Sequence, residues 1–315
     1  MTNRIVSLIA SATEIVYALG FGSELVGRSH ECDFPPQVKG LPQCTSPKFN
    51  TDGTSYEIDQ RVKAILQEAV SVYRVDAALL DDLAPSHIIT QAQCEVCAVS
   101  LKDVEAAACE MIKSQPKIVS LEPNCLEDIW SDIDRVASAL GAQQRGVDLI
   151  REYKMRMSTV QSAAAKISTK PTVACIEWIN PLMAAGNWMP ELIEMAGGVN
   201  LYGQAGKHSP WMTWAQVEND DPDFIVVTPC GFDIKRTLEE MHLLSDKPSY
   251  KSLKAVKCDH VYVADGNQYF NRPGPRAVES LEIMAEILHP TEFNFGHEGT
   301  GWIRYSNADQ AVAAS

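Results

Sequence analysis

A helical pattern near the middle of the chain, residues 142–166, most constrains the fold. Its apolar side chains recur at intervals of three and four, the period of a helix with one buried stripe. They are Val147, Ile150, Tyr153, Met157, Val160, Ala164 and Ile167. Such a helix is a rod of roughly 37 Å, about one domain diameter. Strands alternate with helices on both sides of it, so we predict two α/β lobes joined by one long helix; the alternative is a long helix inside a single domain.

The length of the chain agrees with two domains, because 315 residues exceed the size at which a single core stops growing. We predict an α/β fold with mainly parallel sheets, since strands and helices alternate in both halves. The predicted boundaries are an N-terminal α/β lobe over 1–141, a connecting backbone helix over 142–168, a C-terminal α/β lobe over 169–290 and a tail over 291–315.

Composition excludes several classes of function. A formal net charge of −14 argues against a nucleic-acid or anionic-membrane surface, which needs local positive potential. No stretch approaches the ~18 apolar residues that a membrane span requires. Glu14 interrupts the first apolar run before a signal-peptide core can form, so we expect a cytoplasmic protein as the sequence stands, and a periplasmic one if a leader has been removed. Nine cysteines without regular spacing favour a reducing compartment.

In the C-terminal half, predicted strands are each followed by a loop and a helix. The strands cover 171–177, 224–228 and 260–263, and the helices 188–195, 237–244 and 276–288. Ligands of open α/β sheets bind at the C-terminal ends of strands, so these loops should line a ligand site. Ser11 follows the first predicted strand of the N-terminal half, so it is a candidate ligand-binding residue of that half for the same reason.

Large aromatic and sulfur-containing side chains gather in these loops. They are Trp178, Met183, Trp188, Trp211, Trp214, Tyr269 and Phe270. A large flat ligand is bound by stacking and apolar burial with a few polar contacts, and tryptophan offers the largest area for this. We favour ligand contact for Trp178 and Trp211, and leave Trp214 and Phe270 open between ligand site and core. Arg272 is interpreted as an anion or propionamide contact, or as a helix cap.

The pair Cys94 and Cys97 forms a CxxC motif, which can chelate a soft metal or cycle between dithiol and disulfide. One CxxC supplies only two of the four ligands of a structural zinc site. Cys32 and His30, in a loop after an N-terminal strand, could complete a Cys3His set. The alternative is that these residues, with Gln93, line a ligand site without metal or redox work. His30 alone could also be an axial ligand to cobalt or iron.

Four segments resemble one known family. They are IASATEIVYALGFGSELVGRSHECDFPP, IEWINPLMAAGNWMPELIEMAGGVNLYG, SPWMTWAQVENDDPDFIVV and DGNQYFNRPGPRAVESLEIMAEIL. Together they look like the helical-backbone substrate-binding proteins of iron-siderophore and vitamin B12 uptake, closest to the cobalamin-binding branch. The resemblance covers roughly residues 4–290. It implies two Rossmann-like lobes joined by a rigid helix, a ligand between them and no catalysis. By this resemblance Met183, Trp211 and Tyr269 match corrin-contacting positions.

Three features depart from the family pattern. The chain shows no leader, whereas family members are normally exported. Ala215 stands near the place where the second transporter-docking acid is expected, so a transporter permease is a possible partner without an evident docking acid. The segment QAQCEVCA replaces a loop that supplies an aromatic wall in the B12 binder, so the ligand can differ.

We therefore predict a binding protein that holds a corrinoid (cobalamin) or related tetrapyrrole, for uptake or for intracellular storage and delivery. Hydrolase and nucleotide motifs are missing: there is no GxSxG, P-loop, HExxH or GxGxxG. No cofactor is required by this prediction. Two alternatives stay open. One is a cytosolic metal-binding or thiol-redox protein that uses Cys94, Cys97, Cys32 and His30, with zinc as a candidate ion. The other is a ferric-siderophore binding protein, which a scarcity of arginine near the site disfavours.

Overall fold

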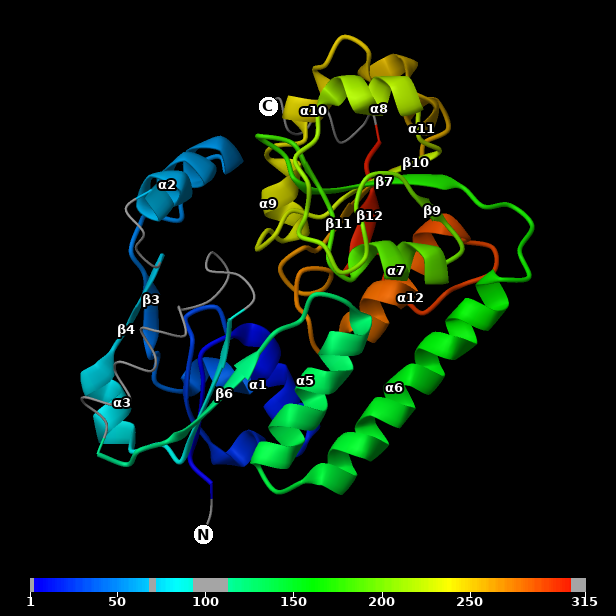
Figure 1. The fold of residues 1–315 in the computed structure, drawn as a ribbon. Coiled ribbons are helices and arrows are strands. Elements are labelled where there is room, and N and C mark those ends of the chain that lie inside the picture. The colour runs from blue at the N-terminus through cyan, green and yellow to red at the C-terminus, as the bar shows by residue number, and fades with distance from the viewer. Residues whose placement is uncertain (1–2, 68–71, 93–112, 307–315) are drawn as a thin grey trace. The chain divides into compact units, whose positions relative to one another are not determined.

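The computed structural model describes residues 3–67, 72–92 and 113–306 (Figure 1). The chain divides into two compact units. The first unit contains Met1–Gly53, Glu57–Pro123 and Glu127–Tyr153, and the second contains Thr54–Tyr56, Asn124–Leu126 and Lys154–Ser315. The last of the boundaries between the two units lies inside one helix, between Tyr153 and Lys154.

The first unit is built on a four-stranded parallel sheet. Its strand order is β2 (Leu25–Arg28), β1 (Ile5–Ser7), β5 (His87–Gln91) and β6 (Lys117–Leu121). Strands β3 (Thr45–Pro47) and β4 (Tyr73–Val75) pair antiparallel beside it. The central strands carry continuous apolar runs such as Ile88–Ile89, which are fully buried, as expected for strands covered on both faces.

Helices connect these strands. They are α1 (Ala10–Ala18), α2 (Ser55–Gln67), α3 (Ala77–Leu83) and α5 (Leu126–Ala139), with short 3-10 turns at Gly22–Glu24 and Pro36–Gly40. Local sequence fixes the start of α3, because the Asp76 carboxylate accepts a hydrogen bond of 2.9 Å from the Leu79 amide.

The long central helix α6 covers Gln143–Ala164 and is continuous (Figure 1). Met157, Val160 and Ala164 are buried as predicted, but Val147 is 49% exposed, so its assignment to the buried stripe is wrong. Gly146 is buried in its place. A Cβ atom on Gly146 would lie 2.6 Å from the Cβ of Ala137, so the missing side chain lets α6 approach α5 closely and turns Val147 outward.

The second unit contains a mixed sheet of six strands. The path is β12 (Trp302–Arg304), β11 (Val261–Ala264), β10 (Phe224–Val227), β7 (Thr172–Trp178) and β8 (Met183–Ala184), and β9 (Val199–Asn200) also pairs with β7. Strands β7, β10 and β11 run parallel, whereas β8 and β12 are antiparallel. The predicted α/β class with mainly parallel strands is confirmed.

Six helices of the second unit follow α6 among the described residues. They are α7 (Met189–Met195), α8 (Trp214–Asp220), α9 (Ile234–Leu238), α10 (His242–Ser245), α11 (Lys254–Lys257) and α12 (Ala277–Leu288), with a 3-10 turn at Tyr250–Ser252. One continuous helix over 237–244 was the prediction, and it is wrong. The amides of Glu240 and Met241 bond to the carbonyls of Thr237 and Leu238, three residues back, and this tighter turn ends α9 and directs Met241 into the core.

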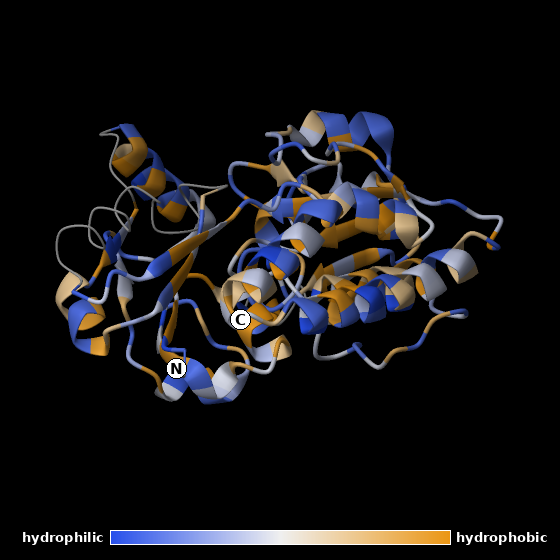
Figure 2. Ribbon diagram, turned by 60° about the horizontal axis from the view of Figure 1, so that its bottom comes forward, coloured by the Kyte–Doolittle hydropathy of each residue, from blue (hydrophilic) through white to orange (hydrophobic). Residues whose placement is uncertain are grey.

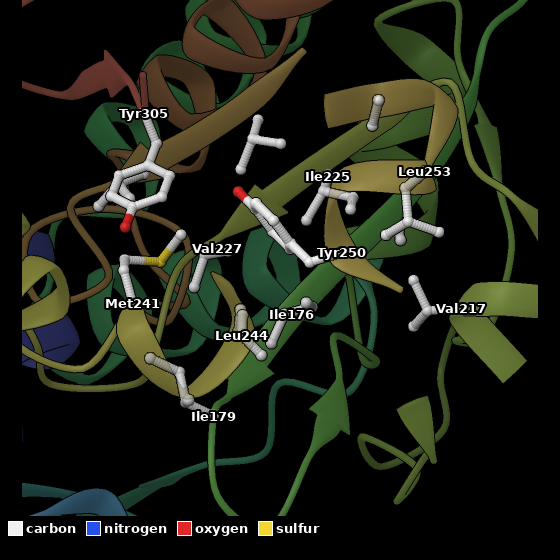
Figure 3. Packing of buried hydrophobic residues seen from close by; sticks show 14 of the residues in the cluster. Ile176, Ile179, Val217, Ile225, Val227, Met241, Leu244, Tyr250, Leu253 and Tyr305 are labelled. Carbon is white, nitrogen blue, oxygen red and sulfur yellow. The ribbon is translucent and has the colours of Figure 1, made fainter. Parts of the chain in front are cut away.

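The core of the second unit lies between its sheet and helices α8 to α11. Figure 3 shows Met241, Leu244 and Tyr250 directed toward Ile176, Ile225 and Val227 of the central strands. Figure 2 shows the same apolar character along the strands. Burying each such side chain contributes about 1.5–3 kcal/mol, so this packing stabilises the sheet that carries the loops.

Candidate functional site

The C-terminal ends of β7, β10 and β11 lie side by side, because these three strands are parallel neighbours. Several residues predicted to bind ligand lie at these strand ends: Trp178 is the last residue of β7, and Tyr269 and Arg272 follow β11. This edge of the second unit is where an open α/β sheet binds its ligand.

Trp178, Met183 and Trp211 form a row across three neighbouring backbone segments. Trp178 pairs with Met183 in the β7–β8 ladder, and Met183 forms an antiparallel bridge with Trp211. Direct partners across a ladder carry their side chains on the same face, and three adjacent segments span about 10 Å. The β7–β8 register shifts between Ile176 and Trp178, and such a bulge re-aims the side chains beyond it. The row is an aromatic and thioether surface.

The two tryptophans of this row are exposed to different degrees. Trp211 is 56% exposed, which is unusual for the largest apolar side chain. Trp178 is half-buried and packs against Phe232 with ring centroids 5.2 Å apart. The indole nitrogen of Trp178 is shielded and has no hydrogen-bond partner among the described residues. The exposed ring of Trp211 is therefore available for stacking, whereas the ring of Trp178 is held in place by its contact with Phe232.

A buried hydrogen-bond chain holds the Trp211 segment against β8. The Gly186 amide donates to Ser209 Oγ at 3.1 Å, and that hydroxyl donates to Glu177 Oε2 at 2.8 Å. A Cβ on Gly186 would lie 2.7 Å from the carbonyl oxygen of Lys207, so the two segments touch. Sequence reasoning missed these supporting residues, although Glu177 directly precedes Trp178.

The loop after β11 is fixed from within by polar side chains. The Asp265 carboxylate accepts hydrogen bonds from the amides of Asn267, at 3.0 Å, and Gln268, at 2.7 Å. Burial raises the pKa of Asp265, and these amide hydrogen bonds oppose the increase. The Asn271 side-chain amide donates to the carbonyls of Thr228 and Gly266 at 3.0 Å each, so the loop is tied to the end of β10.

Two arginines, Arg272 and Arg276, follow Tyr269 in this loop. The Arg276 guanidinium lies 5.3 Å from the centroid of the Tyr269 ring. Arg272 is 7% exposed and donates to Asn267 Oδ1 at 3.1 Å. The N-cap of α12 is Arg276, so the helix-capping alternative for Arg272 is wrong. Both cations lie within the loop that carries Tyr269.

Two of the predicted aromatic residues lie in the interior, and a third, Trp214, is half-buried. Trp188 is 5% and Phe270 1% exposed, and the Trp188 indole donates to the Phe270 carbonyl at 2.9 Å. Trp214 donates to Ser249 Oγ at 2.8 Å and stacks on Tyr250 of the core. We therefore revise the prediction of direct ligand contact for Trp188 and Phe270: they support the loop after β11 from behind.

In the first unit, His30 lies in a polar network after β2. Its Nδ1 is 2.8 Å from Thr45 Oγ1, which also donates to Ser29 Oγ at 3.0 Å. The imidazole contacts the Tyr73 ring at 4.9 Å, and the Tyr73 hydroxyl donates to Glu31 at 2.9 Å. The hydrogen bond with Thr45 and the ring contact with Tyr73 together hold the imidazole of His30 in one orientation.

Burial, and secondarily the charge of Arg28, lowers the pKa of His30 to about 4. The imidazole is neutral at physiological pH as a result. Nδ1 is engaged with Thr45, and the remaining nitrogen, Nε2, lies 4.0 Å from Glu31 Oε1. A neutral imidazole with one available nitrogen can act as a hydrogen-bond partner or a metal ligand.

Ser11 and Cys32 lie in the interior of the first unit, each 1% exposed. Thr13 Oγ1 donates to Cys32 Sγ at 3.0 Å, so this thiol is part of the packing around α1. Ser11 Oγ has no hydrogen-bond partner among the described residues. Neither side chain reaches a surface in this structure, so we revise both from ligand contacts to supporting residues.

Gln93, Cys94 and Cys97 lie outside the described residues, so the predicted metal set of Cys94, Cys97, Cys32 and His30 stays a prediction. Within the residues that the structure describes, no group of three or more His, Cys, Asp or Glu side chains could hold a metal ion. The cysteines that the structure describes are Cys32, Cys44, Cys125, Cys175, Cys230 and Cys258.

Two surface features lie apart from these residues. A depression of about 490 Å³ in the first unit is lined by β6 and α5, and none of the predicted ligand residues borders it. Ala215 is exposed in the first turn of α8, and the nearby acid Glu218 accepts a hydrogen bond from Ser249. Among the described helices, none combines the length and apolarity that crossing a membrane would require.

Comparison with known proteins gives relatives along almost the whole chain. An uncharacterised ABC transporter substrate-binding lipoprotein of Bacillus subtilis is 24% identical over 92% of this chain and 81% of its own length. A vitamin B12-binding protein of Vibrio vulnificus is 24% identical over 90% of this chain and 89% of its own. The periplasmic heme-binding protein RhuT from Roseiflexus sp. RS-1 matches with a TM-score of 0.68 at 22% identity, over 92% of this chain and 99% of its own.

The likeness to the solved structure shows that the chain shares its fold. The model of the family described as "Periplasmic binding protein" matches residues 5–267, which is most of the chain. The protein therefore belongs to the periplasmic binding protein family.

Proposed function

We propose that this protein is the substrate-binding component of an ABC uptake system and that it binds a corrinoid or a related tetrapyrrole. The observation that carries the proposal is the row formed by Trp178, Met183 and Trp211 at the C-terminal edge of the second sheet. A flat macrocycle stacks on such a surface, because aromatic rings offer wide, rigid area at low entropic cost.

The exposure of the Trp211 side chain supports this proposal more strongly than the occurrence of a tryptophan at this position does. Leaving a tryptophan 56% exposed forgoes apolar burial that folding would otherwise gain. The bulge in β7–β8 and the chain of hydrogen bonds through Ser209 hold the segment that carries it. An exposed aromatic side chain on a rigid support is what a preformed stacking surface requires.

The choice among macrocycles depends on the polar groups around the aromatic row. Tyr269, Arg272 and Arg276 lie in the adjacent loop. Cobalamin offers neutral amide groups, whereas haem carries two carboxylates, which favour arginine partners. We propose a corrinoid first, on the resemblance of Met183, Trp211 and Tyr269 to corrin-contacting positions. Haem is the second candidate, because the buried Arg276 lies 5.3 Å from the centroid of the Tyr269 ring and the buried Arg272 belongs to the same loop.

We propose that the protein acts outside the cytoplasmic membrane and delivers its ligand to a transporter permease. The name of the Bacillus subtilis relative, a substrate-binding lipoprotein of an ABC transporter, supports both statements. The predicted departure at Ala215 stands, so docking on a permease would have to use other side chains of the exposed surface.

The test is a set of titrations of purified, reduced and metal-free protein. Cyanocobalamin, hemin and a ferric hydroxamate are added separately, and tryptophan fluorescence and the ligand spectrum are recorded. We expect saturable binding of one macrocycle with a dissociation constant in the micromolar range or below. If neither macrocycle binds at tens of micromolar and the hydroxamate does, the siderophore alternative replaces the proposal.

The same preparation tests the metal or thiol alternative. Zinc is added to the reduced protein and bound zinc is counted after dialysis, in the wild type and in Cys94→Ser. Stoichiometric zinc that disappears in the variant, together with no macrocycle binding, would overturn the proposed function.

A further inference from the structure

The turn formed by residues 295–302 is anchored on α12 by one buried carboxylate. Glu286, 3% exposed, accepts hydrogen bonds from the amides of Phe295 and Gly296, the latter at 2.7 Å, and more weakly from the His297 amide at 3.4 Å. Its second oxygen accepts from the Trp302 indole at 2.7 Å. A carboxylate with this many donors holds the backbone of the turn in one position on the helix.

The imidazole of His297 is fixed by a second carboxylate of α12. Its Nε2 lies 3.2 Å from Glu282 Oε2. The other oxygen of Glu282 accepts from Arg156 of α6 at 2.8 Å, and Arg156 also pairs with Glu279 at 3.5 Å. Glu282 is thus held between a guanidinium and an imidazole, which restricts how the His297 ring can rotate.

The other side of the His297 ring meets Tyr269, a candidate ligand residue. The ring centroids are 6.1 Å apart and the planes lie at 69°, an edge-to-face contact. The Arg276 guanidinium lies 5.3 Å from the centroid of Tyr269. Two cationic or potentially cationic side chains therefore border the Tyr269 ring, one from its own loop and one from the turn.

The same turn also supports the beginning of the loop that carries Tyr269. The Asp265 amide donates to the Gly301 carbonyl at 2.9 Å, and the Gly301 amide donates to the His297 carbonyl at 2.7 Å. A Cβ on Gly301 would lie 2.8 Å from Ile283 Cδ1, so the turn rests directly on α12. The turn thus contacts the loop at two points: the Gly301 carbonyl bonds to the Asp265 amide, and the His297 ring contacts the Tyr269 ring.

We propose that His297 is a positioning residue, which fixes the ring of Tyr269 for ligand binding and makes ligand affinity depend on the charge of its imidazole. This inference rests on the proposed function and adds a residue that contacts no ligand itself. The charged or titratable groups around the imidazole are Glu279, Glu282, Glu286, Arg156, Tyr269 and Arg276.

The carboxylates near His297 determine the direction in which ligand affinity changes with pH. The hydrogen bond to Glu282 raises the pKa of His297 above its ordinary 6.5, against the effect of burial, and Glu286 and Glu279 add to it. The charged imidazole is therefore held more firmly in the folded protein than the neutral one. This contribution is complete below pH 6.5 and is lost as the pH rises through the pKa of the folded state. Affinity falls over the same interval.

The experiment has an arm without ligand and an arm with ligand. In the first, the protein carries isotope-labelled histidine and tyrosine rings, and their NMR signals are followed against pH in the ligand-free wild type. Signals are assigned with His297→Gln and Tyr269→Phe. We expect Tyr269 to report the same titration midpoint as His297, above 6.5, and to lose it in His297→Gln.

In the second arm, the dissociation constants of cyanocobalamin and hemin are measured across the same pH range. We expect affinity to fall about fivefold as His297 loses its proton, because charge-assisted hydrogen bonds are about twice as strong as neutral ones. In His297→Gln, affinity should equal the high-pH value throughout. The control is His242→Gln at an exposed histidine of α10, which should keep the wild-type pH profile.

The two arms separate failure of this inference from failure of the proposed function. If neither macrocycle binds, the proposed function fails, and the ligand-free arm still decides whether His297 controls Tyr269. A Tyr269 signal that does not follow the titration of His297, or a His297→Gln variant that keeps the pH slope of binding, would overturn the inference. Circular dichroism and the urea midpoint of each variant identify loss of folding.

Discussion

Gly266 lies so close to Pro229 that a Cβ atom at residue 266 would be 2.1 Å from the Pro229 carbonyl oxygen. This contact joins the loops that follow β10 and β11, the two loops that border the candidate ligand surface. The backbones can approach so closely only because glycine has no side chain.

Gly266→Ala should therefore separate the two loops. We expect the free energy of unfolding to fall by about 2 kcal/mol, because the crowding atom is backbone and cannot rotate away. Ligand affinity should fall as well, since Asn271 bridges the same two loops. Urea unfolding and fluorescence titration measure the two effects. Gly40→Ala is the control, because a Cβ there has no neighbour within 4 Å, and a variant of Gly266 as stable as this control would contradict the argument.

Trp211→Ala should weaken ligand binding without weakening the fold. The side chain is 56% exposed, so its removal costs little core packing. If it stacks on the ligand, its loss should raise the dissociation constant by roughly 30-fold, the equivalent of about 2 kcal/mol for an aromatic contact residue.

The measurement is the titration of the bound macrocycle, with the thermal midpoint recorded for each variant. Met155→Ala on α6 is a control for loss of an exposed apolar side chain, since Met155 is 64% exposed and lies in the middle of a helix. An unchanged dissociation constant in Trp211→Ala would remove the main support for the aromatic row.

The α/β class and the loops that carry the site could be predicted because they depend on local patterns. Apolar runs such as Phe224–Val227 and the helical period of residues 142–166 are visible in the sequence itself. Parallel strands then bring their C-terminal ends to one edge by geometry alone. This is why Trp178 and Tyr269 could be assigned from the sequence to the same edge of the sheet.

The direction in which a loop side chain points could not be predicted. Trp188 and Trp211 occur in similar sequence surroundings, yet one is buried and the other exposed. The difference comes from a hydrogen bond between Trp188 and Phe270, 82 positions apart. The role of His297 could not be predicted for the same reason. Its contacts with Glu282 and Tyr269 arise only when the turn folds onto α12.

Glu286→Gln should loosen the turn that His297 belongs to. An amide keeps one acceptor oxygen and loses the charge, so the hydrogen bonds from Gly296 and Trp302 weaken. Hydrogen bonds to a charged group contribute about 1.5–3 kcal/mol, and we expect a loss of about 2 kcal/mol in the free energy of unfolding.

Hydrogen exchange localises this effect. Amides of residues 295–302 should lose protection in Glu286→Gln before the central strands do, because the turn opens without unfolding the sheet. Glu292→Gln, at an exposed glutamate shortly before this turn, should leave exchange unchanged. Protection in Glu286→Gln equal to that of Glu292→Gln would show that the carboxylate does not anchor the turn.

His30→Gln should make the protein less sensitive to acid. Burial lowers the pKa of His30 to about 4 in the folded state, against 6.5 when unfolded. Between these values the unfolded chain binds a proton that the folded protein does not, so stability falls as the pH decreases from 6.5 to 4, by up to about 3 kcal/mol. Urea unfolding at pH 7, 5.5 and 4.5 (roughly 1 to 1.5 units apart across the titration) should show a shallower loss of stability in His30→Gln than in the wild type. His242→Gln, at an exposed histidine, should retain the full loss. Equal slopes in wild type and His30→Gln would mean that other groups control the acid sensitivity.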